Sequence, residues 1–207
     1  MDIIPNFAVL EGSDGSGTTT QLSILQNRIK SAGNIRCFST FEPTDNKTGR
    51  LIRCALKKEI TLTPETLCYL FAADRNEHLY GHEGLINHIK NGELVICDRY
   101  LFSSLVYQGI ECGDNLPEIL NSFFPLPEMT IFLDIKPEIA VERIKNRSSI
   151  EIYEVLEFQE KVYRKYLDIL EIYGKKSKVE IIDASAGVEE VADQVWSKIC
   201  QMPIFKT

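Results

Sequence analysis

The stretch Gly12-Ser13-Asp14-Gly15-Ser16-Gly17-Thr18-Thr19-Thr20 follows a short apolar run, Phe7–Leu10, and opens a segment with apolar residues at helical spacing, residues 19–32. A strand, a glycine-rich turn and a helix in this order direct backbone N–H groups and the positive end of a helix towards an anion. The spacing is that of the phosphate-binding pattern G-x-x-x-x-G-K-[ST]. The sequence therefore predicts a site for a nucleotide phosphate.

One position departs from that pattern, because Thr18 stands where the lysine belongs. Backbone N–H groups and the helix N-terminus bind phosphate without a lysine. What is lost is a point charge that reaches the β- and γ-phosphates. Glycine-rich turns also occur where the backbone only needs a positive φ, so the loop alone leaves an ordinary tight turn open.

Composition limits the class of protein. A chain of 207 residues with 44% hydrophobic residues predicts one domain, spanning 1–207. It has no run of 18 apolar residues, so we expect no membrane span. The net charge of −7 argues against a broad nucleic-acid-binding face. The six cysteines lack a C-x-x-C pair and metal-ligand spacing, which suits a reducing compartment and a cytoplasmic protein.

Five short apolar segments have the pattern of strands buried on both faces of a parallel sheet. They are residues 7–10, 36–40, 94–97, 129–133 and 179–182. Helical patterns occupy residues 19–32, 47–58, 64–90, 101–107, 115–123, 137–147, 153–173 and 187–200. The alternation predicts an α/β fold, a doubly wound five-stranded parallel sheet flanked by helices. The polar stretch at about 147–155 is expected to form a short lid.

Two polar features stand out in the predicted α/β fold. The strand 94–97 runs directly into Asp98-Arg99-Tyr100. Ligands of open α/β sheets bind at the carboxyl ends of the strands, and a carboxylate at such a strand end can lie near a nucleotide's magnesium. The alternative is a strand that meets solvent and turns polar.

His78 and His82 are four residues apart, and without a third metal ligand we expect both to face solvent.

The glycine-rich loop and Asp98–Tyr100 belong to an ordered set of motifs that resembles the thymidylate kinase family and covers nearly the whole chain. The set is Leu10–Gly17, Glu42-Pro43, Leu70–Arg75, Asp98–Tyr100, Ser103-Ser104, Tyr107–Gly109, Leu133-Asp134 with Pro137-Glu138, and Leu156–Gln159. The resemblance implies ATP-dependent phosphorylation of thymidine monophosphate (dTMP) to the diphosphate for dTTP synthesis. It also implies ATP as donor, Mg²⁺ as cofactor and a homodimer.

The resemblance further implies which residues bind each ligand. ATP is expected to contact Gly12, Ser13, Asp14, Gly15, Ser16, Gly17, Thr18, Thr19, Thr20 and Arg147. The acceptor is expected to contact Glu42, Phe71, Arg75, Arg99, Ser103, Ser104, Tyr107 and Gln108. Within that set, Arg75 and Arg99 would hold the monophosphate, Phe71 would stack on thymine and Tyr107 would lie against the sugar.

Two smaller groups complete the implied site. Thr19 and Asp98 would hold Mg²⁺, directly or through water. Asp14, Arg99, Arg143 and Arg147 would act in the transfer itself. Phosphoryl transfer depends on positioning and charge neutralisation rather than on covalent chemistry by the protein.

Positive charge is where the chain departs from the family pattern. Thr18 replaces the loop lysine, and the lid segment Ser148–Leu156 contains no lysine or arginine. A cation supplied to the γ-phosphate contributes roughly 10³–10⁵ in rate. Arg143, Lys145 and Arg147 are the nearest substitutes. Three hypotheses stay open: an active dTMP kinase with rearranged cations, a non-catalytic nucleotide-binding protein, and a kinase for a nucleoside or another deoxynucleotide.

Overall fold

The computed structural model describes residues 1–145 and 156–206. Five parallel strands form one sheet in the order β2-β3-β1-β4-β5. Their bounds are β1 (Ile3–Glu11), β2 (Cys37–Phe41), β3 (Leu94–Asp98), β4 (Leu126–Asp134) and β5 (Lys178–Asp183). The five-stranded parallel sheet predicted from the sequence is therefore confirmed. The predicted lid at about 147–155, with Arg147, lies outside the described residues.

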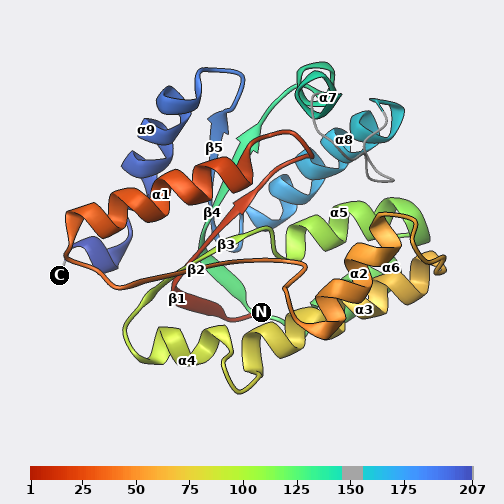
Figure 1. The fold of residues 1–207 in the computed structure, drawn as a ribbon, viewed down its shortest axis with the longest axis horizontal. Helices are drawn as coiled ribbons and strands as arrows, with labels where there is room; N and C mark the ends of the chain where they lie inside the picture. Colours follow the sequence, from red (N-terminus) through yellow and green to blue (C-terminus); the bar gives the residue numbers. More distant parts are fainter. Residues whose placement is uncertain (146–155, 207) are drawn as a thin grey trace.

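Helices cover both faces of the sheet (Figure 1). The described helices are α1 (Thr18–Ala32), α2 (Lys47–Leu56), α3 (Pro64–Tyr80), α4 (Leu85–Lys90), α5 (Leu101–Cys112), α6 (Asn115–Asn121), α7 (Pro137–Lys145), α8 (Leu156–Tyr173), α9 (Val188–Ile199) and a 3₁₀ turn, Pro203–Phe205. None of these described helices is long and apolar enough to cross a membrane.

Successive side chains of β1 point to opposite faces of the sheet. They therefore pack into two separate hydrophobic cores. Phe7 and Val9 pack with buried residues of α2, α3, α4, α5 and α8. Ala8 and Leu10 pack with buried residues of α1, α7 and α9. Because β1 is buried on both faces, it reads as a continuous apolar run.

The register of the central strands decides which loops meet. β1 lies between β3 and β4 and pairs Leu10 with Asp98. The chain enters the glycine-rich loop directly after β1, so the loop begins beside Asp98 and Arg99. The expectation that these segments lie together at the carboxyl edge of the sheet is confirmed by this pairing.

The helix predicted over residues 64–90 is wrong in one respect, because the structure divides it into α3 and α4. Gly81 ends α3 with ψ 175, an extended conformation. A Cβ at Gly84 would lie 2.4 Å from the carbonyl oxygen of Leu79, so the sharp turn admits only glycine. The apolar periodicity continues across the turn because both helices pack on the same core.

The glycine-rich loop packs directly on α7. Gly15 has φ 85, and a Cβ at this position would lie 2.4 Å from the carbonyl oxygen of Ala140. Only glycine allows both the left-handed backbone and this close approach. The loop and α7 therefore form one rigid contact.

We expect Gly15→Ala to destabilise the protein far more than Gly33→Ala. Gly33, after α1, has φ 73 but no atom of the described residues within 4 Å of its Cβ position, so its variant isolates the conformational cost, about 1 kcal/mol. Chemical denaturation measures both. Equal losses would show that the contact between Gly15 and α7 does not constrain the loop.

Candidate active site

A cavity of about 380 Å³ opens at the carboxyl edge of the sheet. It is bounded by the start of α1, the segment after β2, helices α2, α3 and α5, and the end of β3. Its lining residues are Asp14, Thr19, Leu22, Phe41, Glu42, Pro43, Arg53, Leu56, Phe71, Arg75, Asp98, Arg99, Tyr100, Ser103, Ser104, Tyr107 and Gln108.

The structure brings the predicted acceptor residues together. All eight line this single cavity: Glu42, Phe71, Arg75, Arg99, Ser103, Ser104, Tyr107 and Gln108. Asp14, Thr19 and Asp98 join them, which connects the cavity to the phosphate-binding loop. The remaining predicted ATP contacts, residues 12–13, 15–18 and 20, form the loop and the first turn of α1 outside the lining. Arg143 lies exposed on α7.

Thr19 and Asp98 form a pair of oxygen ligands at the loop end of the cavity. The Thr19 hydroxyl donates to Asp98 Oδ2 at 2.6 Å. Asp98 Oδ1 is buried, with no hydrogen-bond partner among the described residues. Mg²⁺ prefers carboxylate, hydroxyl and water oxygens, usually from one or two carboxylates beside a nucleotide's phosphates. The unpaired carboxylate oxygen therefore fits a magnesium ion or its bound water.

Arg99 and Asp14 form a second charged pair across the cavity mouth. Arg99 Nη2 lies 2.6 Å from Asp14 Oδ1, and Gln159 Nε2 donates to Asp14 Oδ2 at 3.0 Å. The Arg99 guanidinium lies 5.3 Å from the centre of the Tyr107 ring. The backbone of Arg99 has φ 67, a left-handed conformation uncommon outside glycine and often found at functional sites.

Arg75, predicted to hold the monophosphate together with Arg99, is more deeply buried than Arg99. Its side chain is 1% exposed, against 20% for Arg99. Arg75 Nε donates to Glu42 Oε2 at 2.9 Å, Nη2 donates to Ser104 Oγ at 3.0 Å, and Nη1 bonds to Asn121 Oδ1. The geometry thus places Arg75 in the floor of the cavity and Arg99 at its mouth, rather than side by side.

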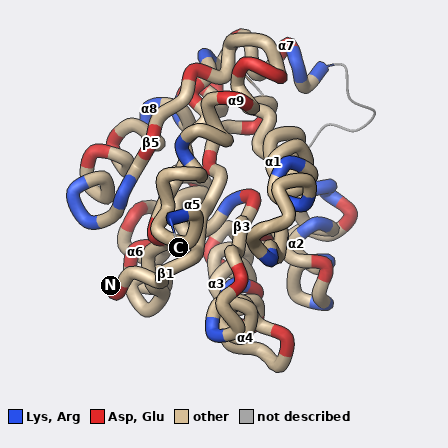
Figure 2. The backbone as a smooth tube through the Cα atoms, turned by 90° about the vertical axis from the view of Figure 1, so that its left-hand side faces the viewer, with Lys and Arg blue, Asp and Glu red and all other residues tan. Residues whose placement is uncertain are grey.

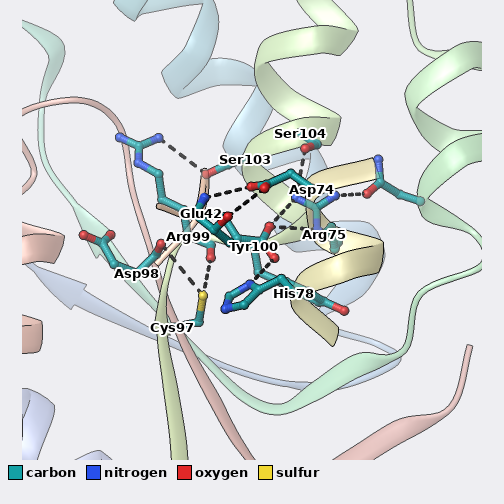
Figure 3. A network of polar contacts seen from close by, with 12 residues as sticks. Glu42, Asp74, Arg75, His78, Cys97, Asp98, Arg99, Tyr100, Ser103 and Ser104 are labelled. Atoms are coloured by element: carbon teal, nitrogen blue, oxygen red, sulfur yellow. Dashed lines mark hydrogen bonds and ion pairs between the residues drawn. The ribbon is translucent and has the colours of Figure 1, made fainter. Parts of the chain in front are cut away.

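His78 also converges on Glu42, as Figure 3 shows. Its Nδ1 lies 2.9 Å from Glu42 Oε1 and its Nε2 lies 2.7 Å from Thr40 Oγ1. The expectation that His78 and His82 both face solvent is wrong for His78, which is buried, and right for His82, which is exposed. Helical spacing gave no sign of this partner, because Glu42 comes from a distant loop.

Glu42 is a buried carboxylate with two basic neighbours. Burial by itself raises the pKa of Glu42, but the Arg75 guanidinium and the bond from His78 lower that pKa below its ordinary value. A buried carboxylate that pairs with arginine in this way stays ionised at neutral pH. The charges of Glu42 and Arg75 therefore nearly cancel in the floor of the cavity.

The cavity also contains a cation that sequence reasoning missed. Arg53, on α2, donates from Nη1 to the carbonyl oxygen of Thr44 at 2.6 Å and from Nη2 to that of Pro43 at 2.5 Å. Its guanidinium lies 5.3 Å from the centre of the Phe41 ring. Leu56, three residues on and so on the same helical face, lines the same cavity, but no sequence pattern marked Arg53 as part of a site.

Gln108 contributes an unpaired donor to the cavity wall. Its side chain is 2% exposed, and Nε2 has no hydrogen-bond partner within the described part of the chain. Leaving a buried amide without a partner is costly, so this N–H donor is available to a hydrogen-bond acceptor on a ligand. Phe71 and the partly exposed Arg99 line the same cavity, so its lining offers a stacking face, a hydrogen-bond donor and a cation.

We expect Glu42→Gln to lower the free energy of unfolding by about 3 kcal/mol at neutral pH, because it leaves Arg75 as a buried, unpaired charge. The lowered pKa gives Glu42 a stabilising contribution that is present above its unfolded-state pKa and lost as pH falls through its lowered pKa. The difference between wild type and variant should therefore shrink in acid. Urea titrations across this pH range measure it.

Glu189→Gln is the matched control, since Glu189 pairs with Arg28 on the surface and such pairs contribute little. The loss of unfolding free energy in Glu42→Gln should shrink as the pH falls and should exceed the loss in Glu189→Gln. A constant loss, or one no larger than in the control, would contradict an ionised pair of Glu42 and Arg75.

Comparison with known proteins identifies the family. The family model described as thymidylate kinase matches residues 10–195. A protein of Treponema pallidum (strain Nichols) named "Putative thymidylate kinase" is 40% identical over 200 residues, 94% of this chain and 95% of its own length. "Probable thymidylate kinase" of Pyrococcus abyssi is 39% identical over 197 residues, covering 91% and 93%. "Thymidylate kinase" of Clostridium novyi is 34% identical over 200 residues, covering 91% and 95%. This chain belongs to the thymidylate kinase family.

Proposed function

We propose that the protein transfers the γ-phosphate of ATP to dTMP, giving thymidine diphosphate. One observation carries this conclusion: the eight residues expected to hold the acceptor line one cavity, and that cavity opens onto the phosphate-binding loop. The names of the similar proteins support the same acceptor.

The chemistry of the wall suggests how dTMP lies in the cavity. The half-buried Phe71 offers a stacking face, and the unpaired Nε2 of Gln108 offers a donor to a ring carbonyl. The Tyr107 ring lies 5.3 Å from the Arg99 guanidinium, and we propose that it contacts the sugar. The monophosphate would then face Arg99 and Arg53, the two partly exposed arginines of the lining.

In this arrangement the chain's own groups position the two nucleotides. The loop and the start of α1 would hold the phosphates of ATP by backbone N–H groups. Thr19 and Asp98 would hold Mg²⁺, which when bound supplies positive charge to the donor phosphates. Asp14 holds the Arg99 guanidinium at 2.6 Å, and that guanidinium would neutralise charge on the acceptor phosphate.

We assign the charge that Thr18 cannot supply to Arg143. The contact between Gly15 and Ala140 sets α7 against the loop, and Arg143 lies one turn further along that helix, exposed. An exposed arginine on a helix that touches the loop can swing towards a phosphate. Arg147, also expected to act here, lies outside the described residues.

The missing lysine also favours a second candidate, a non-catalytic protein that binds the same nucleotides. Phosphate binding by the loop survives without lysine, whereas the transfer rate depends strongly on the missing charge. A kinase for a nucleoside is less favoured, because Arg99 and Arg53 would then face no phosphate.

We further propose that the protein is a cytoplasmic homodimer that does not bind nucleic acid. Exposed apolar side chains lie on neighbouring helices, α2, α3 and α6, or just beyond them: Leu51, Tyr69, Tyr80, Ile119 and Phe123. We propose that they form part of an association surface, since a large exposed apolar patch is typical of one. In the view of Figure 2, Lys and Arg positions are interspersed with Asp and Glu, unlike the basic face of a nucleic-acid-binding protein. Analytical ultracentrifugation tests the dimer.

We expect dTMP to be the preferred acceptor in a coupled assay with ATP, Mg²⁺ and a panel of nucleoside monophosphates. Calorimetry should show that dTMP binds about tenfold or more tightly than thymidine, since a charge-assisted hydrogen bond is worth roughly 1.5–3 kcal/mol. Equal binding of thymidine, or turnover of another monophosphate in preference to dTMP, would overturn the proposed acceptor.

Arg143→Ala should lower kcat at least about tenfold while leaving the KM for dTMP nearly unchanged, because the lost charge acts on the donor phosphates. Thr18→Lys in the Arg143→Ala background should restore turnover. Arg164→Ala is the control, since that arginine is exposed on α8. Unchanged turnover in Arg143→Ala would refute its role. If the wild type transfers nothing and Thr18→Lys alone creates activity, the non-catalytic candidate is correct.

A further inference from the structure

A second buried carboxylate, Glu11, lies behind the cavity and outside its lining. Glu11 is the last residue of β1 and is 1% exposed. Its carboxylate accepts four hydrogen bonds: from Tyr100 N at 3.0 Å, Ser103 N at 3.3 Å, Ser103 Oγ at 2.6 Å and Tyr166 Oη at 3.0 Å. The described contacts thus tie β1 to the start of α5 and to α8.

Glu11 supplies the cap that α5 lacks. The N-terminal N–H groups of a helix have no partner within the helix and need an acceptor. Tyr100, at the N-cap position of α5, makes no side-chain capping bond. Glu11 takes that place from the neighbouring strand and puts a negative group at the positive end of the helix.

This cap fixes the strained turn that carries Arg99. The N–H of Arg99 donates to the carbonyl oxygen of Leu10 at 2.8 Å, and the next N–H, that of Tyr100, donates to Glu11. Two consecutive residues of β1 therefore hold both sides of a residue with φ 67. A left-handed non-glycine residue persists only where its surroundings enforce it.

We propose that Glu11 is a positioning residue, which holds the turn at Arg99 so that the guanidinium faces Asp14 and the acceptor's phosphate. The inference rests on the proposed function, because it requires an acceptor that carries a phosphate. Glu11 touches neither nucleotide in this account. It acts through the backbone of residues 99–103 and the hydroxyl of Ser103, which also accepts from Arg99 Nη1 at 3.4 Å.

Glu11→Gln is a mild way to test this role. The amide keeps the volume of the side chain, so it opens no void, but it offers one acceptor oxygen in place of two. Burial raises the pKa of Glu11, opposed by the bond from Ser103 and by the charge of Arg99. The amide therefore keeps one acceptor, loses the hydrogen bonds that the second oxygen accepts and buries no charge, and we expect the variant to fold.

The decisive measurement is the ratio of the dissociation constants for thymidine and dTMP, which isolates the contribution of the phosphate. Calorimetry compares wild type, Arg99→Ala, Glu11→Gln and the double variant. We expect the ratio to fall about tenfold in Arg99→Ala and about fivefold in Glu11→Gln. The double variant should match Arg99→Ala, because residues that act through one group are not additive.

Tyr166→Phe is a second variant that keeps the experiment decisive if Glu11→Gln does not fold. It removes one donor to Glu11, and the ratio should fall about twofold. Tyr173→Phe, seven residues further along α8, removes a hydroxyl that is not among the groups bonded to Glu11. It should leave the ratio of the two dissociation constants unchanged.

The outcomes separate the two claims. A wild type that binds thymidine as tightly as dTMP overturns the proposed acceptor, and this inference with it. If the wild type binds dTMP more tightly than thymidine and this preference is unchanged in Glu11→Gln and Tyr166→Phe, the role of Glu11 is overturned. The proposed acceptor then stands. Equal loss of affinity for thymidine and dTMP would also overturn it, because Glu11 would then support the whole cavity and not Arg99.

Discussion

The pairing of β1 with β3 is the constraint on which the site depends. Parallel pairing sets Leu10 opposite Asp98, and both strands end at that level. The glycine-rich loop leaves one strand as Asp98-Arg99 leaves the other, so Thr19 reaches Asp98 and Asp14 reaches Arg99. Side chains 79 and 85 residues apart in sequence meet because backbone hydrogen bonds between adjacent strands fix their register. A slip of one residue would turn every side chain to the opposite face.

Four charged side chains of the cavity form two ion pairs. Arg75 with Glu42 forms the floor and Arg99 with Asp14 the mouth. Burying a lone charge is very costly, and even a pair recovers its desolvation cost only with good hydrogen bonds. The floor meets this condition, since Ser104, Asn121 and His78 complete the bonds of Arg75 and Glu42. Such a floor is rigid, whereas the partly exposed arginine at the mouth remains accessible to an anion.

Under the proposed function, the absence of the loop lysine would affect phosphate binding and transfer rate differently, because the two depend on different groups. The loop would bind an anion through backbone N–H groups and the start of α1, and Thr18 keeps its backbone N–H as a lysine would. The lysine adds a charge whose effect is greatest as charge moves during transfer. The packing of Gly15 on α7 brings another helix, with its own arginine, to the same loop.

The sequence by itself determined the sheet, the glycine-rich loop and the set of predicted acceptor residues that line one cavity. Buried strands and the loop glycines are marked by local patterns of two to nine residues, and the motif order singled out eight residues that line one cavity. Only the tertiary structure decided the depth of Arg75, the bond between His78 and Glu42, the place of Arg53, the break between α3 and α4 and the capping of α5 by Glu11. Each of these depends on packing or on a partner from another element, and periodicity within one segment carries no information about such a partner.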